Sequence, residues 1–380
     1  MKHFILIILL ICIFCVSMNN KTSFKEKKHT KTNNVNNVNN VNNVNKEILF
    51  YKCDKFVLGK IVKEVINNNN IKRTPNIEDN WLLFLPCSYN NIESEMKKMD
   101  NTKNKILFGI KGCDLLVSKN NLWKLLENKY SRSNAKYMMP ETWILSNNKQ
   151  MELFKNNYSE KNMYIMKKNI QRKEGLLLTN NLEEIINNND KKFRVVQKYM
   201  RNTYMINKRK VNLRIYLLIV YRNNKLTSYY YKNGKCIYTN KDYTGSNELE
   251  QNITSLNLDM DIYKKNPFDL FELVNFMDKK KYVILIENIK KNLKKLEIMY
   301  RNMISNLNKN NNKNIHFQLF GLDYIFDDDL NVYLLELNKG PDMTSKNDKD
   351  YVLKYRIYED LFNKVGLINY ENENMFEEII

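Results

Sequence analysis

The amino-acid sequence predicts an α+β fold that is built around an antiparallel sheet. Two apolar runs, residues 211–221 and 227–231, are separated by an Asn-Asn turn signal at 223–224, which is typical of a hairpin. Near the C-terminus, residues 317–338 contain two further apolar strands around an acidic turn. Apolar residues at helical spacing over residues 282–307 predict a long helix before that second hairpin.

A small α/β lobe is predicted for residues 46–139. Residues 81–85 and 106–109 are short apolar runs, which indicate strands. Leucines within residues 120–129 recur at helical spacing and predict a helix.

A central lobe is predicted for residues 140–210. Short apolar runs at residues 143–145 and 195–197 indicate strands. Two further runs, 164–166 and 176–178, flank a polar, basic loop that contains a glycine, so they predict a hairpin. The remaining residues form a C-terminal lobe, 211–380, which holds the antiparallel sheet.

The first 45 residues differ from the rest of the chain. Residues 1–18 contain an apolar run of about 22 Å if helical, shorter than the roughly 30 Å of a bilayer core, which predicts a signal peptide or a signal anchor. Residues 19–45 are rich in Lys and Asn and predict a disordered leader, so the folded unit should begin near Lys46. A signal followed by a basic, acid-poor stretch resembles the bipartite plastid leaders of apicomplexan parasites. We therefore expect passage into the secretory pathway, onward to a plastid, and membrane contact only through an uncleaved N-terminal segment.

Composition limits the possible functions. Hydrophobic residues make up 43% of the chain, which is enough for a buried core. Lys and Arg outnumber Asp and Glu by 62 to 42, giving a net charge of +20 that attracts acidic partners. The alternative is a compositional bias toward Lys, because the basic residues are spread along the chain. Only three histidines and six cysteines are present. Cys12 and Cys15 have C-x-x-C spacing but lie inside the apolar N-terminal run, and the other four cysteines are scattered, which argues against a zinc site, a Cys-His nucleophile or a Ser-His-Asp triad.

The second hairpin carries three polar residues inside apolar strands. Alternation places Asp323 on one face of the first strand, and Glu336 and Asn338 together on one face of the second. If Asp323 lies opposite Glu336, continuous pairing leaves a two-residue loop at 329–330. One hairpin then presents three oxygen ligands together.

These oxygen ligands predict a metal site. Carboxylates placed so close repel each other unless a cation or a proton separates them, and carboxylate and amide oxygens are ligands that Mg²⁺ accepts beside phosphates. The alternative is an exposed hairpin with surface polar residues. The apolar sequence around them favours burial on both faces.

The segment RKVNLRIYLLIV places a basic row on one strand face. Lys210, Asn212 and Arg214 alternate and therefore point the same way. Such a row suits a triphosphate whose charge grows during transfer. The alternative is a basic strand edge that discourages aggregation.

Four segments in this order resemble the tubulin-tyrosine-ligase family: LVSKNNLW, MYIMKKNIQRKEGL, QKYMRNTYMINKRKVNLRIYLLIV and KNIHFQLFGLDYIFDDDLNVYLLELNKGPDM. The similarity runs from about residue 81 to residue 343. The resemblance implies an ATP-grasp fold in which the nucleotide lies between two antiparallel sheets and Mg²⁺ bridges its phosphates. It also implies that a carboxylate is activated as an acyl phosphate before an amine attacks it.

The resemblance also implies roles for individual residues. The Mg²⁺ ligands would be Asp323, Glu336 and Asn338. The nucleotide would be contacted by Lys119, Lys167, Gln197, Lys198, Tyr199, Lys210 and Arg214. Of these, Lys119 and Lys167 would meet the phosphates, and the residues at 197–199 would form the adenine hinge. The catalytic roles would fall to Lys210, Arg214 and Glu336.

Three positions depart from the family pattern. Asn212 stands where the family usually has Asp, and Ile237 stands where a second Arg follows the Tyr-x-x-Gly turn near Gly234. Lys168 replaces the Pro after the phosphate-contacting lysine. Loss of a charged group from such a site can lower the rate by orders of magnitude, so weak, altered or absent activity is compatible with the sequence.

The expected function is ATP-dependent ligation of a free amino acid (Tyr, Glu or Gly) to a carboxylate on an acidic protein tail such as that of tubulin. If the leader is not used, we expect association with the cytoskeleton. The first alternative is a catalytically weak or dead member that binds ATP or an acidic partner. The second is a nucleic-acid-binding protein, which is disfavoured because no recognition motif is present and the 24 tyrosines are interleaved with aliphatic residues as in a core.

Overall fold

A computed structural model describes residues 48–52, 58–88, 91–169, 175–187, 192–309 and 313–380. The predicted signal segment and leader, residues 1–45, lie outside these described residues. Glu47–Ile380 forms one compact unit. In the described part of the chain, no helix combines the length and the apolar character that crossing a membrane requires.

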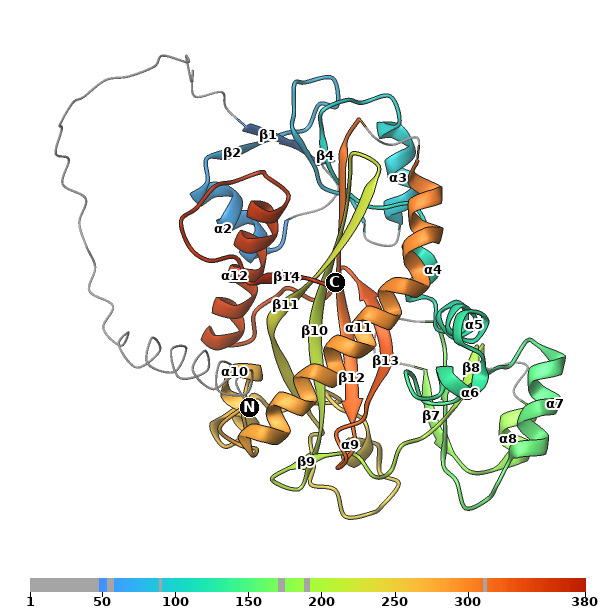
Figure 1. Ribbon diagram of the computed structural model, residues 1–380. Coiled ribbons are helices and arrows are strands. Elements are labelled where there is room, and N and C mark those ends of the chain that lie inside the picture. Colours follow the sequence, from blue (N-terminus) through green and yellow to red (C-terminus); the bar gives the residue numbers. More distant parts are fainter. Residues whose placement is uncertain (1–47, 53–57, 89–90, 170–174, 188–191, 310–312) are drawn as a thin grey trace, which may run out of the picture. The chain divides into compact units, whose positions relative to one another are not determined.

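The elements are labelled as in Figure 1. The strands are β1 (Ile48–Tyr51), β2 (Ile71–Thr74), β3 (Leu83–Phe84), β4 (Ile106–Phe108), β5 (Thr142–Ile144), β6 (Tyr164–Lys167), β7 (Leu176–Thr179), β8 (Val195–Lys198), β9 (Met205–Ile206), β10 (Arg209–Arg222), β11 (Lys225–Tyr238), β12 (Ile315–Phe326), β13 (Val332–Lys339) and β14 (Phe376–Glu378). The helices are α2 (Lys60–Asn68), α3 (Ile92–Met96), η2 (Lys97–Met99), α4 (Asp114–Val117), α5 (Lys119–Tyr130), α6 (Arg132–Ala135), α7 (Asn148–Asn157), α8 (Leu182–Ile186), α9 (Leu249–Asn252), η3 (Met260–Lys264), α10 (Leu270–Leu273), α11 (Lys279–Asn308) and α12 (Asp348–Lys364).

Two sheets organise the described residues. The large mixed sheet has the order β14-β11-β10-β12-β4-β3-β1-β2, with β13 added beside β12 and β9 beside β10. The small sheet has the order β5-β8-β6-β7 and is antiparallel. These sheets confirm the predicted α+β class.

Strand β12 is the central element of the large sheet. It pairs with β10 along one edge, while β4 and then β13 share its other edge. The pairing with β4 is parallel, so the strands predicted as a separate small lobe continue the large sheet. The predicted lobe boundaries near residues 140 and 211 stay predictions.

Helix α11 covers part of the large sheet, as Figure 1 shows. It begins where the Asp278 side chain accepts hydrogen bonds from the backbone N–H groups of Lys280 and Lys281. Its buried residues recur every three or four positions, so one stripe faces β11, β13 and α5. The predicted helix at 282–307 is thereby confirmed.

The predicted hairpin after residue 221 is formed by β10 and β11. Arg222 lies opposite Lys225, which leaves Asn223 and Asn224 as a two-residue turn. Their φ angles are 51° and 61°, the left-handed values that a type I′ turn requires and that Asn tolerates better than other residues with a side chain.

The predicted loop of the second hairpin is wrong. Phe326 pairs with Val332, so residues 327–331 form the loop in place of residues 329–330. The Asp327 carboxylate accepts the backbone N–H of Asn331 at 2.9 Å and closes this wider turn. A bulge between the partners of Asp323 and Tyr324 absorbs the shift in register.

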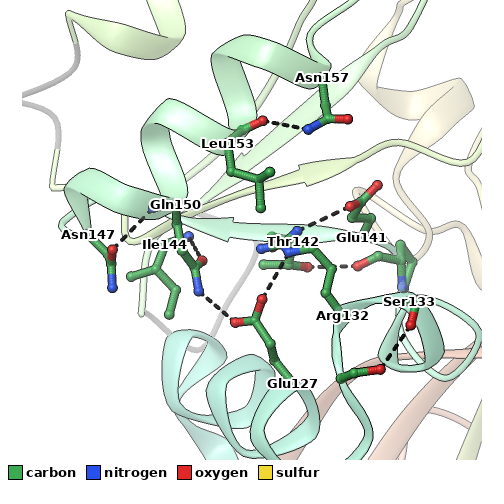
Figure 2. Close-up of polar contacts among 12 residues, drawn as sticks. Glu127, Arg132, Ser133, Glu141, Thr142, Ile144, Asn147, Gln150, Leu153 and Asn157 are labelled. Carbon is green, nitrogen blue, oxygen red and sulfur yellow. Dashed lines mark hydrogen bonds and ion pairs between the residues drawn. The ribbon is translucent and has the colours of Figure 1, made fainter.

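A polar cluster joins the small sheet to the helices beside it (Figure 2). Arg132 of α6 donates from Nε to Glu127 Oε1 at 2.9 Å, from Nη1 to Glu141 Oε1 at 3.2 Å, and from Nη2 to the carbonyl of Thr142 at 3.0 Å. The guanidinium carbon also lies 5.1 Å and 5.3 Å from the ring centres of Trp123 and Trp143. One planar cation therefore connects α5 to the first strand of the small sheet.

Gln150 extends this cluster. Its amide nitrogen donates to Glu127 Oε2 at 2.7 Å, and its amide oxygen accepts the N–H of Ile144 at 2.8 Å (Figure 2). Helix α7 is thus tied to β5 and α5 at once.

The Asn-Asn turn can be tested by substitution. We expect Asn224→Val to lower the free energy of unfolding by about 1–2 kcal/mol, because a β-branched residue is strained at positive φ. Asn224→Gly is the matched control, since it removes the same side-chain hydrogen bond from Tyr221 but accepts the backbone angle. Urea denaturation measures both values, and equal losses in the two variants would contradict the turn assignment.

The Arg132 cluster gives a second test. We expect Arg132→Met to lower the free energy of unfolding by about 2–3 kcal/mol, because two partly buried carboxylates lose their shared cation. Arg132→Lys should recover only part of this loss, since an ammonium lacks the planar fork. Hydrogen exchange should locate the weakening in β5 and β8. Exchange that rises equally in β12 would show that the effect is not confined to this junction.

Candidate functional site

A large cavity lies between the small sheet and the large sheet. Its volume is about 1130 Å³, more than most sites for a single small ligand need. The ten residues predicted from the sequence as site residues all line it: Lys119, Lys167, Gln197, Lys198, Tyr199, Lys210, Arg214, Asp323, Glu336 and Asn338. The structure thus brings the whole predicted set together, while the role of each residue stays a prediction.

Positive charge dominates the cavity lining. Nine Lys and Arg residues line it, against three Asp and Glu residues. Such an excess in a cavity with restricted solvent attracts a polyanion. A triphosphate has the charge and the shape that such a lining accommodates.

The second hairpin supplies the acidic end of the site. Asp323 of β12 lies directly opposite Glu336 of β13, as predicted from alternation. Asn338 follows on the same face and donates from Nδ2 to Glu336 Oε1 at 3.1 Å. The bulge in β13 lies between Glu336 and the turn. The side chains of Asp323, Glu336 and Asn338 therefore still point to the same face of the sheet.

Side-chain cations already balance the two carboxylates. Arg214 donates from Nε to Asp323 Oδ1 at 2.5 Å and from Nη2 to Oδ2 at 2.9 Å, a bidentate pair. Lys119 Nζ lies 3.2 Å from Glu336 Oε2. The predicted repulsion between the two carboxylates is therefore relieved by side-chain cations, which come from distant segments that alternation within a hairpin does not reveal.

The pKa of Glu336 follows from these neighbours. Burial by itself raises the pKa of this carboxyl, but Lys119 and Lys167 outweigh burial and lower it below its ordinary value. The pKa of the Arg214 guanidinium is raised, because Asp323 outweighs the effect of burial. Both groups therefore stay charged at neutral pH.

The donor set fits Mg²⁺ better than zinc. In the described part of the chain, no three His, Cys, Asp or Glu side chains are grouped so that they could hold a metal ion. The candidate site offers two carboxylates and one amide, which are oxygen donors. Mg²⁺ takes one or two protein carboxylates and completes its shell with water and phosphate oxygens. Asp323, Glu336 and Asn338 would hold it.

Gly321 gives Arg214 the room to reach Asp323. A Cβ atom at position 321 would lie 2.9 Å from Arg214 Cδ and 3.0 Å from Pro341 Cβ. A side chain there would displace the guanidinium or the loop after β13. This glycine sits two residues before Asp323, but its importance could not be inferred without the partner strand.

Lys167 is held by Gln197 at the small-sheet wall. Lys167 Nζ donates to Gln197 Oε1 at 2.7 Å, and Gln197 Nε2 donates to Thr142 Oγ1 at 2.8 Å. Burial lowers the pKa of Lys167 to about 8. The Gln197 side chain thus orients a lysine, a role that sequence reasoning did not foresee.

In the predicted adenine hinge, two backbone N–H groups already donate hydrogen bonds to other parts of the chain. The backbone N–H of Lys198 donates to the carbonyl of Glu141 at 2.8 Å, and that of Tyr199 donates to the carbonyl of Met163 at 2.9 Å. Contacts from these two residues to a base would therefore come from their carbonyl groups and side chains.

Lys210 lies in an aromatic setting. Its Nζ donates to the Tyr199 hydroxyl at 2.8 Å and lies 3.9 Å from the ring centre of Tyr243. Burial, together with Arg201, lowers the pKa of Lys210 to about 8. Asn252, from the segment that follows β11, also accepts from Lys210 Nζ at 3.3 Å.

The three residues that depart from the family pattern, Lys168, Asn212 and Ile237, also line the cavity. Asn212 and Ile237 are direct cross-strand partners, so the two changes meet at one point. Asn212 Nδ2 donates to Thr254 Oγ1 at 2.8 Å, while its buried Oδ1 has no hydrogen-bond partner among the described residues. Lys168 lies over the ring of Phe193 at 5.2 Å.

Three lining lysines were missed by sequence reasoning: Lys235, Lys346 and Lys354. Lys235 could have been found, because it precedes Ile237 by two residues and so shares its strand face. The other two come from α12 and the segment before it, which carry no recognisable pattern.

Comparison with known proteins identifies the family. The tubulin-tyrosine ligase family model matches residues 96–374. The mouse "Probable tubulin polyglutamylase TTLL9" is 26% identical over 187 residues, which cover 46% of this chain and 38% of that protein. "Tubulin glycylase 3C" of Tetrahymena thermophila is 29% identical over 200 residues, covering 48% of this chain and 18% of that protein. "Tubulin glycylase 3B" of Drosophila melanogaster is 22% identical over 249 residues, covering 57% and 32%.

The chain spans well under half the length of these curated relatives. The family match nevertheless covers most of this chain, including the small sheet, the acidic hairpin and the strands of the large sheet from β4 to β13. A large mixed sheet facing a small antiparallel one across a cationic cavity agrees with the predicted ATP-grasp fold. The chain belongs to the tubulin-tyrosine ligase family.

Proposed function

We propose that this chain is an ATP- and Mg²⁺-dependent ligase that joins a free amino acid to a protein carboxylate. The observation that carries the proposal is the cavity itself, in which a surplus of lysines and arginine surrounds the acidic pair Asp323 and Glu336. A family of ligases and an oxygen donor set suited to Mg²⁺ point to the same chemistry.

The reaction has two steps that balance. An oxygen of the acceptor carboxylate attacks the γ-phosphorus of ATP, and ADP leaves. The amine of the free amino acid then attacks the acyl carbon, phosphate leaves, an amide bond forms, and the amine loses a proton. Mg²⁺, when bound, would neutralise charge on the phosphates.

The residues of this chain supply fixed positive charge. Arg214 is held in place by two hydrogen bonds to Asp323, so it can meet the transferring phosphoryl group without reorganising. Lys167 and Lys210 are buried cations whose charge is stabilised by an arriving phosphate.

The acceptor we propose is an acidic protein tail. The net charge of +20 would speed the encounter with such a polyanion. The relatives named above are tubulin-modifying enzymes, which makes the tubulin tail one candidate acceptor. Tyr, Glu and Gly are the candidate amino acids.

One cysteine gives information about the cellular compartment in which the protein resides. Cys87, which follows β3, is disulfide-bonded. Disulfides persist mainly in oxidising compartments, which supports the proposed passage into the secretory pathway. An acceptor that shares this compartment would be an acidic tail other than that of cytosolic tubulin.

A catalytically weak member that binds ATP is the second candidate. Asn212 and Ile237 put a neutral pair in the cavity where the family usually has an acid and a base. The acidic hairpin and the lysines remain in place, so such a protein would still bind the nucleotide even if it no longer catalysed ligation. Incubation of the protein with ATP, Mg²⁺, labelled amino acids and a panel of acidic tails separates the two candidates.

Replacing Glu336 tests the metal and the enzyme together. We expect Glu336→Gln to lower Mg²⁺-dependent turnover by roughly 100-fold or more, because one Mg²⁺ ligand charge is lost. The protein without ligands should also become less stable, since Lys119 and Lys167 lose a counter-ion. Because the pKa of Glu336 is lowered by folding, this stabilisation is present at neutral pH and disappears under acid conditions.

Asp328→Asn is the matched control, because it removes an exposed carboxylate from the same hairpin. Turnover by Glu336→Gln equal to that of this control would remove Glu336 from the mechanism. If the wild type shows no turnover but is stabilised by ATP and Mg²⁺, and Glu336→Gln loses that shift, the weak-enzyme candidate is correct.

The two lysines with pKa values of about 8 give a pH test. At pH 8.5 each lysine is roughly three-quarters neutral, and a bound triphosphate should raise both pKa values, so binding should take up roughly 1.5 protons. Affinity should therefore weaken as the pH rises above about 8. Calorimetry in two buffers with different ionisation enthalpies measures the uptake, which should be absent at pH 6.5.

Lys210→Met should reduce this uptake by about half and leave the remainder. Binding without proton uptake at pH 8.5 would show that these lysines do not meet the phosphates.

A further inference from the structure

Helix α11 lies on the side of the large sheet that faces away from the candidate site. Tyr324 of β12 donates from its hydroxyl to Asn292 Oδ1 of α11 at 3.2 Å. Asp323, the preceding residue of β12, lines the cavity, and successive side chains of a strand point to opposite faces. Helix α11 therefore packs against the face of the large sheet opposite the cavity, and it crosses that face as Figure 1 shows.

The outer face of α11 combines lysines with aliphatic side chains. With 3.6 residues per turn, seven exposed residues fall within an arc of about 120° around the helix. They are Lys280, Val283, Ile284, Lys291, Lys294, Lys295 and Ile298. The three aliphatic side chains are 43% to 49% exposed. Lys279 and Lys281 lie just beyond the edges of this arc.

These lysines lack carboxylate partners. In the described part of the chain, the ion pairs of α11 are formed by Lys290 and Arg301 and by none of the six lysines named above. By contrast, Lys349, Lys354 and Arg356 of α12 each pair with a carboxylate. A compositional bias toward Lys would affect both helices alike, so it does not explain the difference.

The placement of the lysines also works against the helix itself. Lys279, Lys280 and Lys281 occupy the first turn, which contains no acidic residue, although the positive end of the helix dipole disfavours cations there. Lys291 precedes Lys295 by four residues, so like charges repel each other along the outer face. Helix stability therefore does not account for this row of cations, whereas an anionic partner would.

We propose that the outer face of α11 binds an anionic membrane surface. Its lysines meet the phosphate and carboxylate groups of the lipid heads, while Val283, Ile284 and Ile298 enter the boundary with the acyl chains. A soluble polyanion, such as nucleic acid or an acidic protein tail, has no apolar layer and would leave these aliphatic side chains in water. A lipid interface covers both kinds of side chain, so it is the partner that the composition of this face favours.

The shape and position of α11 suit this contact. A helix rises 1.5 Å per residue, so the outer face from Lys279 to Ile298 extends about 29 Å, and a convex face of this length fits a flat surface. The cavity lies on the opposite side of the large sheet, so it stays accessible in a membrane-bound protein. The contact is separate from the one expected of an uncleaved N-terminal segment, and two such signals attach a protein more stably than one.

A local reporter, Ile284→Trp in the full chain, provides the decisive test. The native residues Trp81, Trp123 and Trp143 are buried, so the new indole reports on the outer face. We expect its emission to shift to shorter wavelength on vesicles that contain phosphatidylserine, and to be quenched by lipids brominated on their acyl chains. Vesicles of phosphatidylcholine alone should give little change at about 0.15 M salt. An N-terminal segment that holds the protein on a vesicle does not by itself produce this signal.

Charge reversal tests the electrostatic part of the contact. In the reporter protein, the combined changes Lys280→Glu, Lys291→Glu and Lys294→Glu should raise the lipid concentration for half of the shift at least about 100-fold, because each lysine near an anionic surface contributes roughly fivefold in affinity. This variant should melt no lower than its parent, because a glutamate near the start of α11 suits the helix dipole.

The matched control reverses three exposed lysines on α7 and in the segment that follows it, and it changes the net charge by the same amount. These changes are Lys149→Glu, Lys155→Glu and Lys161→Glu. The control should move the half-maximal lipid concentration less than about threefold, because distant charges are screened by salt.

The proposal is overturned if the indole shows no shift on phosphatidylserine vesicles even when the protein floats with them, because another segment then makes the contact. Equal loss of the shift in the two charge-reversed proteins would also overturn it. Binding of an oligoglutamate peptide or of RNA through the same three lysines, without a shift on vesicles, would assign the face to a soluble polyanion instead. These outcomes are independent of the ligase proposal, since neither nucleotide nor turnover enters the test.

Discussion

The site depends on one bidentate ion pair, between Arg214 and Asp323, at the centre of the large sheet. The two residues lie opposite each other on β10 and β12. On its other side, Arg214 lies opposite Lys235 of β11, and Asp323 lies opposite Glu336 of β13. Because side chains alternate along a strand, a slip of one residue in any register would send one of these charges into the apolar core. The buried aliphatic residues between them, such as Leu213 and Leu322, set that register by the same alternation.

The ion pairs also explain how a site so rich in charge can be buried within the fold. Glu336 is balanced by Lys119 and Asp323 by Arg214, so neither carboxylate is buried alone. Among the described residues Lys167 and Lys210 form no direct ion pair, although Glu336 lies close enough to Lys167 to act on it, and burial lowers the pKa of each lysine to about 8. The side chains of the site therefore neutralise its acidic end and leave its lysine-rich end short of negative charge, which is the condition that favours binding of a polyanion.

Much of this could be predicted from the sequence, because strand alternation is a local property. The faces shared by Lys210 and Arg214 and by Glu336 and Asn338 required only a period of two, and the hairpin turn signals placed the strands. The counter-ions could not be predicted, because Arg214 and Asp323 are 109 residues apart in the chain. The five-residue loop was missed for a different reason, since the Asp327 side chain closes a turn that alternation alone does not reveal.

The family departures at positions 212 and 237 are related through the register. These residues are cross-strand partners, so the usual Asp and Arg would lie face to face, and their joint replacement by Asn and Ile removes one charge of each sign. No buried charge is left unpaired by this exchange, whereas loss of a single partner would be costly. A cation remains on the same face of β11, two residues before Ile237, where Lys235 lies opposite Arg214. The register therefore gives a physical reason for the two departures to occur together, because an exchange at only one of the two positions would leave the opposite charge without its cross-strand partner.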